Sequence, residues 1–267
     1  MLIDIFADDW IDVLDARAAV LPPSSHLYLL LDGAFVPGLH NVLADDRKLV
    51  LFSALPGCTN ETRDVSPFLT ELRRGDKCSR AILKRCDGWP MVSVIETSET
   101  FEDLAKRLFA WCVVEADNQR FNFRFSDTRR LPAVLKILDA VQRSQLTGPA
   151  VRWSFIARDG CWHELDLVPS TGDVALDPQL DQPQFAALVE DSLADELMVL
   201  LGDRGHDAFL HPSASHALLS SALRAARKGK LDDEDVPAWC ECFWRRGQTV
   251  DELSALSLLE TWRNSDQ

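Results

Sequence analysis

The sequence lacks the short motifs by which many enzymes are recognised. It contains no Gly-rich phosphate loop after an apolar run, no Gly-Lys-Ser/Thr triplet, no Gly-x-Ser-x-Gly elbow and no His-Glu-x-x-His pair. His163-Glu164 has no second histidine one helical turn later, and zinc chemistry needs that histidine. We therefore expect no catalytic residues, no cofactor and no enzymatic activity.

Positive charge is also scarce. The chain carries 28 Lys and Arg residues against 42 Asp and Glu residues, which gives a net charge of −14. A surface of this sign gains no binding energy from a phosphate backbone or an anionic membrane. We expect neither nucleic acid nor membrane as a partner, and predict a basic or apolar protein surface instead.

Long apolar runs are missing too. No window approaches the roughly 20 apolar residues of a membrane-spanning helix. The first nine residues have no basic region ahead of their acidic residues, unlike a signal peptide. The seven cysteines are odd in number and scattered, which is typical of reduced thiols. These features predict a cytoplasmic protein.

Two groups of potential metal or redox ligands have unsuitable spacing. His206, His211 and His216 recur five residues apart, so they do not share one helix face. One residue separates Cys240 from Cys242, whereas redox and zinc pairs have two residues between them. We expect exposed histidines, buried helix thiols and no metal.

The sequence does contain a regular alternation of apolar strands and amphipathic helices. Apolar runs predict strands at 26–31, 48–53, 91–96 and 121–126, and a hairpin over 151–166. Helical periodicity and capping residues predict helices at 8–20, 36–43, 66–72, 77–85, 98–112 and 127–147. In the third of these, Ser66 before Pro67 has the pattern of an N-cap and a first-turn proline. This order predicts an α/β fold with a mixed β-sheet flanked by helices.

A change of composition after residue 168 predicts a boundary. The stretch 169–173 is rich in turn residues, and few periodic apolar positions follow up to residue 183. We predict an α/β domain over 1–168, a linker over 169–183 and a smaller all-helical C-terminal lobe over 184–267. Within the lobe, Thr249 and Glu252 have the spacing of a capping box.

The stretch from Phe121 to Leu131 is the element around which we expect the rest of the chain to be organised. Its three phenylalanines alternate with polar residues, so a strand would place them all on one buried face. Asp127 is predicted to cap the helix that follows, and Pro132 fits the first turn of that helix.

The charged residues of this stretch are the candidate site. For Arg124 and Asp127, one alternative is an internal salt bridge that fixes the turn, and the other is a binding surface. Arg129 and Arg130 are expected to be exposed in a first helical turn, where the helix dipole disfavours cations, so a partner-facing role gains weight. Because a planar guanidinium suits carboxylates and interfaces, we predict partner binding by Arg124, Asp127, Arg129 and Arg130.

The chain resembles the effector chaperones, also called adaptors, of bacterial type VI secretion. The resemblance covers roughly residues 27 to 165 and rests on the order of five short motifs: Leu-Leu-Leu-Asp-Gly-Ala at 29–34, Ser-Pro-Phe-Leu at 66–69, the segment 98–101, Phe-Arg-Phe-Ser-Asp-Thr-Arg at 123–129, and Gly148-Pro149 with Trp153. The usual family version of the central motif reads Phe-Arg-Phe-Tyr-Asp-Pro-Arg. Ser126 stands here for the tyrosine and Thr128 for the proline, so contacts of that tyrosine do not carry over.

The resemblance implies a non-enzymatic cytoplasmic protein that binds a toxic effector before secretion and helps to load it onto the spike complex. An immunity protein that binds and neutralises a cognate toxin is the alternative, because it would be equally acidic and free of catalytic motifs. An enzyme on an α/β scaffold is a third interpretation, since a fold alone does not fix a function.

Overall fold

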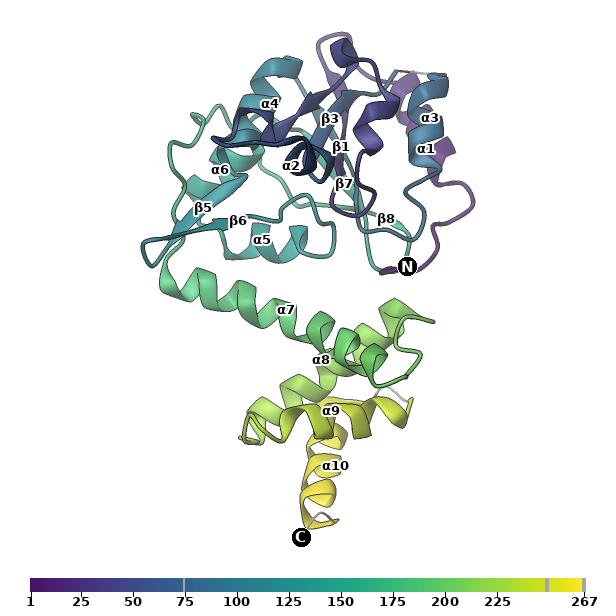
Figure 1. Cartoon of the computed structure of the whole chain (residues 1–267), viewed down its shortest axis with the longest axis vertical. Coiled ribbons are helices and arrows are strands. Elements are labelled where there is room, and N and C mark those ends of the chain that lie inside the picture. Colours follow the sequence, from purple (N-terminus) through teal and green to yellow (C-terminus); the bar gives the residue numbers. More distant parts are fainter. Residues whose placement is uncertain (74, 248–249, 266–267) are drawn as a thin grey trace. The chain divides into compact units, whose positions relative to one another are not determined.

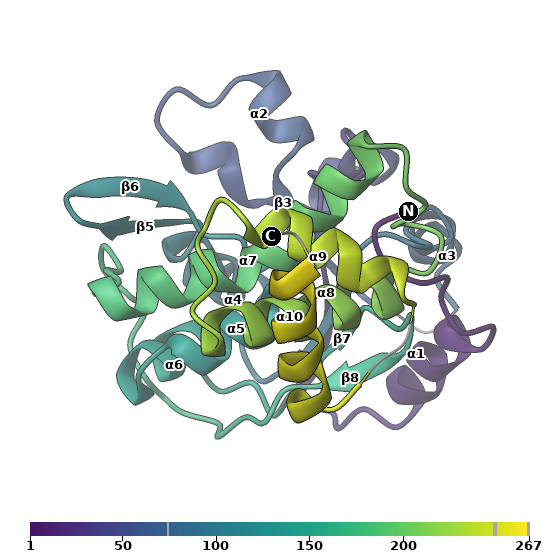
Figure 2. The same ribbon diagram turned by 90° about the horizontal axis from the view of Figure 1, so that it is seen from below.

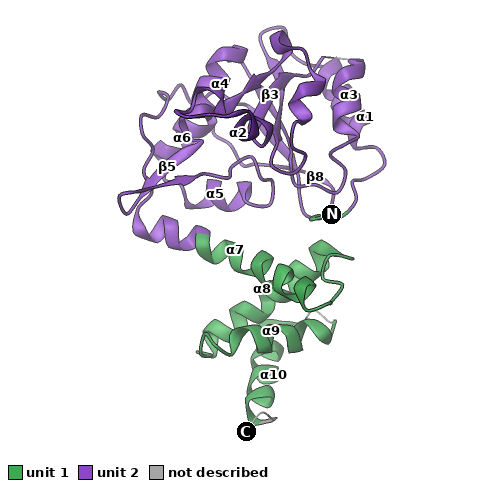
Figure 3. Cartoon of the chain, viewed as in Figure 1, with its two compact units in different colours: residues 1–4, 189–267 green, residues 5–188 purple. Residues whose placement is uncertain are grey.

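A computed structural model describes residues 1–73, 75–247 and 250–265 of the chain. The chain forms two compact units (Figure 3). The sheet unit comprises Ile5–Leu188, and the helical unit comprises Met1–Asp4 with Val189–Gln267. Helix α7 (Gln182–Asp203) begins close to the predicted start of the helical lobe at residue 184 and continues through the boundary between the units.

The sheet unit is built around an antiparallel sheet (Figure 1). In the described residues the sheet has six strands in the order β2-β3-β1-β4-β7-β8. These are β1 (His26–Asp32), β2 (Leu49–Val50), β3 (Pro67–Glu71), β4 (Val92–Thr97), β7 (Arg152–Ile156) and β8 (Trp162–Glu164). Strand β1 lies at the centre between β3 and β4, and all its residues after His26 are buried.

The predicted α/β class, with helices flanking a sheet and a helical C-terminal region, is confirmed. The sheet is not mixed in strand direction, because every pair of neighbouring strands described in it is antiparallel. Strands β3 and β4 do run parallel to each other, but β1 lies between them. Alternation of strands and helices along a sequence does not show which strands become neighbours, so this direction could not be inferred.

The helix predicted at 66–72 is wrong, because these residues form strand β3. Pro67 is the first residue of the strand, a position that tolerates a proline. The Ser66 hydroxyl accepts a hydrogen bond from Phe52 N–H at 2.9 Å and donates one to the Pro67 carbonyl at 2.7 Å. A buried strand with a serine and a proline at its start therefore has the same local pattern as a capped helix.

The other early elements follow the prediction more closely. Helices α1 (Trp10–Ala19), α3 (Lys77–Leu83) and α4 (Phe101–Ala110) form as expected, and β7 with β8 makes the predicted hairpin. The predicted strand at 48–53 is reduced to β2 and a 3-10 turn, η3 (Leu51–Ala54), and the helix predicted at 36–43 is a 3-10 turn, η1 (Leu39–Val42). Two further short elements are η2 (Asp45–Arg47) and α2 (Asn60–Asp64). The N-cap of α4 is Thr100, which accepts from Asp103 N–H, and not Ser98.

The strand predicted over 121–126 is shorter than expected. Strands β5 (Val113–Ala116) and β6 (Gln119–Asn122) lie side by side as a separate two-stranded ribbon (Figure 2), and β6 ends at Asn122. Phe123 and Phe125 are buried in the core beneath the sheet, as predicted. Phe121 is only half-buried, and its ring packs on Phe185 at 4.7 Å between centroids.

The single helix predicted at 127–147 is two helices, α5 (Leu131–Ile137) and α6 (Ala140–Thr147). The chain is extended at Leu138, and Asp139 with Gln142 forms a capping box that starts α6. Val141, in the first turn of α6, is 65% exposed. Asp127 is not the N-cap of α5; that position belongs to Arg130, although Pro132 does lie in the first turn.

The helical unit packs α7, α8 (Pro212–Lys228), α9 (Val236–Arg245) and α10 (Glu252–Ser265) around their own core. Its fully buried residues include Leu219, Trp239 and Phe243. The predicted capping residue Thr249 lies outside the described residues. Across the part of the chain that the structure covers, no helix is both long enough and apolar enough to span a membrane.

Candidate functional site

The candidate site begins at the carboxyl end of the central strand. Asp32 is the last residue of β1 and is 1% exposed. Its Oδ1 accepts from Ala34 N–H at 3.0 Å, and its Oδ2 accepts from Arg124 Nη2 at 3.0 Å. A residue of the buried sheet centre is therefore paired with a guanidinium from the loop after β6, 92 positions further along the chain.

A second buried carboxylate fixes that loop. Asp127 is 2% exposed and accepts from Arg129 three times: from the backbone N–H at 3.0 Å, from Nε at 3.1 Å and from Nη2 at 2.8 Å. Its Oδ2 also lies 3.7 Å from Arg124 Nη2. The next residue, Thr128, donates its N–H to the Pro90 carbonyl at 3.0 Å, which ties the loop to the residues just before β4.

Two half-buried aromatic rings complete the arrangement. The guanidinium carbons of Arg124 and Arg129 lie 5.4 and 5.5 Å from the centre of the Phe35 ring. Phe35 stacks on Trp89, with 6.2 Å between ring centroids and 26° between ring planes. We call Asp32, Phe35, Trp89, Arg124, Asp127 and Arg129 the arginine–aromatic cluster.

The electrostatics of the cluster are those of a balanced, partly buried network. Burial raises the pKa of Asp32 above its ordinary value, and the Arg124 guanidinium opposes that rise. Two carboxylates face two guanidinium groups, so the network is close to neutral. Arg124 is its exposed member, with 41% of the side chain accessible, whereas Arg129 is 13% exposed. The contacts of Arg124 with Asp32 and Asp127 are both made through Nη2.

The structure brings together three of the four predicted site residues. Arg124 and Asp127 make the internal contacts of the salt-bridge alternative. The expectation that Arg129 is exposed on a helix is wrong, because its guanidinium folds back onto Asp127 before α5 begins. Arg130 contributes through its backbone, whose N–H donates to the Asp127 carbonyl at 2.9 Å.

Sequence reasoning missed the partners from other parts of the chain. The sequence motif at 29–34 contains Asp32 but gives it no partner, and no motif contains Phe35 or Trp89. One local signal existed for the first of these: an aspartate directly follows a run of apolar strand residues, where burial would demand a cationic partner. No local signal pairs that aspartate with Arg124.

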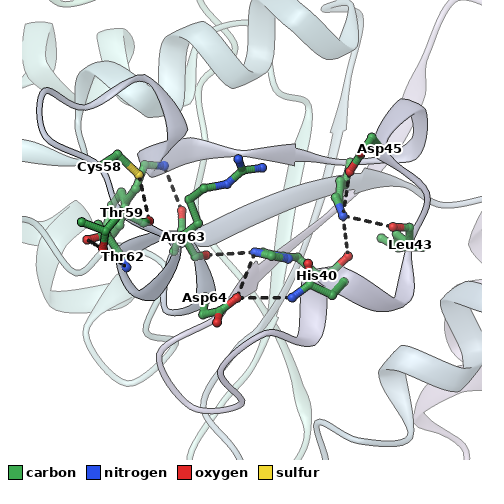
Figure 4. A network of polar contacts seen from close by, with 12 residues as sticks. His40, Leu43, Asp45, Cys58, Thr59, Thr62, Arg63 and Asp64 are labelled. Atoms are coloured by element: carbon green, nitrogen blue, oxygen red, sulfur yellow. Dashed lines mark hydrogen bonds and ion pairs between the residues drawn. The ribbon is translucent and has the colours of Figure 1, made fainter.

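A second polar network links the loops around η1 and α2 (Figure 4). The Lys48 ammonium is buried and donates to the carbonyls of His40 at 3.2 Å and Leu43 at 3.1 Å, and it lies 3.1 Å from Asp45 Oδ1. The His40 ring is within 3.1 Å of the Arg63 carbonyl and 3.7 Å of Asp64. Burial, followed by the charge of Lys48, lowers the pKa of His40. These contacts join η1 to the end of α2 and hold the loops together.

In the part of the chain that the structure describes, the other histidine, cysteine and acidic side chains do not form a common metal site. Over residues 1–73, 75–247 and 250–265, no group of three or more His, Cys, Asp or Glu side chains could hold a metal ion. His206 is partly buried and pairs with Glu241 at 2.9 Å, beside Arg204 and Arg245. All seven cysteines are free, and burial raises the pKa of Cys240 to about 12.

Comparison with known proteins gives one match. No curated protein matches the chain. No solved structure matches it either. Residues 27–145, which include every member of the arginine–aromatic cluster, match the model of a family described as a domain of unknown function, DUF4123.

Proposed function

We propose that the protein is a non-catalytic chaperone, or adaptor, that binds a type VI secretion effector in the cytoplasm and assists its loading onto the spike complex. The motifs that resemble effector chaperones span residues 27–165, and the family-model match covers 27–145 of the same segment. The observation that carries the proposal is the fold of the central motif at 123–129. It forms a surface cluster suited to recognition around Arg124.

The cluster has the properties of a protein-binding site. Arg124 is held by Asp32 and Asp127, so little conformational entropy is lost when it contacts a partner. Its guanidinium belongs to a side chain that is 41% exposed, and a guanidinium suits a carboxylate or a backbone carbonyl. Phe35 and Trp89 add apolar surface next to it, and aromatic residues with arginine dominate the energetically important positions of protein interfaces.

Our proposal assigns different roles to the four predicted residues. Arg124 contacts the effector directly, while Asp127 and Arg129 hold the loop in the binding conformation. Arg130 starts helix α5 at the edge of the same surface. The helical unit contributes further contacts to the effector or to the spike protein.

The test is co-expression of the full chain with each effector encoded beside its gene, followed by pull-down. We expect a stoichiometric complex with one of them, and Arg124→Ala should weaken it at least tenfold while the protein stays folded. Arg120→Ala is the matched control, because Arg120 is an exposed arginine on the adjacent ribbon and lies outside the cluster. Failure to capture any of these effectors, or equal loss in the control, would contradict the proposal.

A second experiment, a survival assay, distinguishes a chaperone from an immunity protein. Cells that express only the toxic domain of the captured effector should die whether or not this protein is present. Survival in its presence would show that it neutralises the toxin, and the immunity interpretation would replace ours.

A further inference from the structure

The helical unit contains an open apolar groove that the proposed function does not use. Three of its helices, α7, α8 and α9, enclose a volume of about 670 Å³. From α7, Leu193, Leu197 and Leu200 line it at helical spacing, and Leu223 of α8 and Leu231 also line it. The groove lies outside the segment 27–145 that matches the family model.

The leucines that line the groove form a partly exposed apolar surface. Leu197 belongs to the core, but Leu193, Leu200, Leu223 and Leu231 are only half-buried. Half-exposed leucines at positions i and i+7 of one helix, together with leucines from the next helix and the loop after it, form the kind of surface into which an amphipathic helix packs its apolar face. The volume is that of an ordinary ligand site.

Charge around the groove defines the occupant further. Glu196 on one wall and the run Asp232–Asp235 at the start of α9 are exposed. Two cationic side chains line the groove, Arg227 and Lys230, and Arg227 forms an ion pair with Glu190. The acidic side chains around the groove therefore outnumber the cationic side chains that could balance them. The segments 1–4 and 189–267 together hold sixteen Asp and Glu residues and eight Lys and Arg residues. The negative electrostatic potential of this excess of acidic residues favours a ligand that carries positive charge.

We propose that the groove binds an amphipathic α-helix of a partner protein, with a leucine-rich face against Leu193, Leu200 and Leu223 and with lysine or arginine on its flanks facing Glu196 and the 232–235 run. This inference goes beyond the proposed function and does not depend on it, because it concerns another surface and another recognition chemistry.

The probe is a fluorescein-labelled peptide of about 18 residues with leucines at i, i+3, i+4 and i+7 and lysines elsewhere. Binding to the full-length protein is followed by fluorescence anisotropy. A peptide with glutamate in place of lysine should bind about tenfold more weakly, because two or three exposed ion pairs are lost and like charges face each other. A scrambled Leu/Lys peptide of equal composition should also bind more weakly.

Two matched variants locate the site. Leu200→Asp places a charge in the groove and should weaken binding of the Leu/Lys peptide at least tenfold. Val199→Asp changes the neighbouring residue of α7, which is 52% exposed and does not line the groove, and should leave binding unchanged. Asp233→Lys reverses a charge at an exposed position and should weaken the Leu/Lys peptide while it strengthens the Leu/Glu peptide.

Several results would overturn the inference. Equal affinity for the Leu/Lys and Leu/Glu peptides would do so, as would equal effects of Leu200→Asp and Val199→Asp. If Leu200→Asp fails to fold, Asp233→Lys decides the question alone. Sedimentation that shows a dimer of the parent protein, broken by Leu200→Asp, would assign the groove to a second copy of the chain instead. None of these outcomes depends on whether an effector is captured in the pull-down.

Discussion

The sharpest prediction concerns Arg124→Met, which removes the guanidinium but keeps an unbranched apolar stem beside Phe35. Asp127 would retain its three contacts with Arg129. Asp32, which is 1% exposed in the parent protein, would retain only the Ala34 N–H. The variant therefore tests one buried charge without its counterion.

The size of the effect follows from these contacts. Breaking a buried ion pair by removing one partner costs about 3–5 kcal/mol when both groups are buried. Because Arg124 is 41% exposed, water already screens part of its attraction to Asp32, and we expect the free energy of unfolding to fall by about 2 kcal/mol near neutral pH. Arg124→Met combined with Asp32→Asn should recover most of that loss, since no charge is then left unpaired.

The pH dependence gives the decisive signature. Burial raises the pKa of Asp32, and loss of Arg124 raises it further, so the folded variant binds a proton that the unfolded chain has released. A group with a raised pKa stabilises the fold below its unfolded pKa, and this contribution is lost as pH rises through the folded pKa. The cost of Arg124→Met should therefore be largest near pH ~8 and should shrink towards pH ~4.

Urea unfolding followed by tryptophan fluorescence at several pH values measures this, because Trp111 and Trp153 are buried in the same unit. The transition of the sheet unit is fitted separately from that of the helical unit. A cost of less than about 0.5 kcal/mol, or one that does not change with pH, would refute the assignment of Arg124 as the counterion of Asp32.

Three further predictions concern the supports of the site. Lys48→Met leaves the carbonyls that the ammonium binds without a donor, and urea unfolding should show a loss of about 1–3 kcal/mol; an unchanged midpoint would mean that water replaces the ammonium. Burial lowers the pKa of His40, so the unfolded chain binds more protons than the folded chain just below pH ~6.5, and the free energy of unfolding should fall as the pH drops through that range. His40→Gln should make this fall smaller, and a pH profile identical to that of the parent protein would contradict the prediction. In Gly33→Ala the new Cβ would lie 2.4 Å from the Ser66 backbone oxygen, so thermal unfolding should show a loss of about 1–3 kcal/mol, and a stable variant would show that this turn can shift.

The elements that sequence could predict are those whose signal is repeated along the element itself. Strand β1 is a continuous apolar run, and α4 and α7 repeat apolar residues at helical spacing over several turns. The sequence of strand β3 predicts a helix because its start has the pattern of an N-cap and its apolar residues do not alternate with polar ones. Its pairing with β1 and β2, which depends on the tertiary structure, makes it a strand.

The same limit explains how the candidate site was only half predicted. The stretch 123–129 was singled out by its density of arginines beside aromatic residues, and three of its charged side chains do meet. The partner Asp32 is the last residue of β1, Phe35 comes from the turn after that strand, and Trp89 comes from the segment before β4. Pattern within one segment cannot report a pairing across 92 residues, and the buried aspartate at the end of β1 was the one clue available.

The way each carboxylate is used supports a role in recognition over one in proton transfer. Both oxygens of Asp32 accept hydrogen bonds, one from Ala34 and one from Arg124, and both oxygens of Asp127 are occupied by Arg129. A general base needs a carboxylate that can reach a substrate, whereas these two are buried behind the groups they bind. What the cluster presents at the surface is the accessible edge of one guanidinium and two half-buried rings. Such a surface can form hydrogen bonds and stacking contacts without chemical change, which is what the proposed role of binding an effector and later releasing it requires.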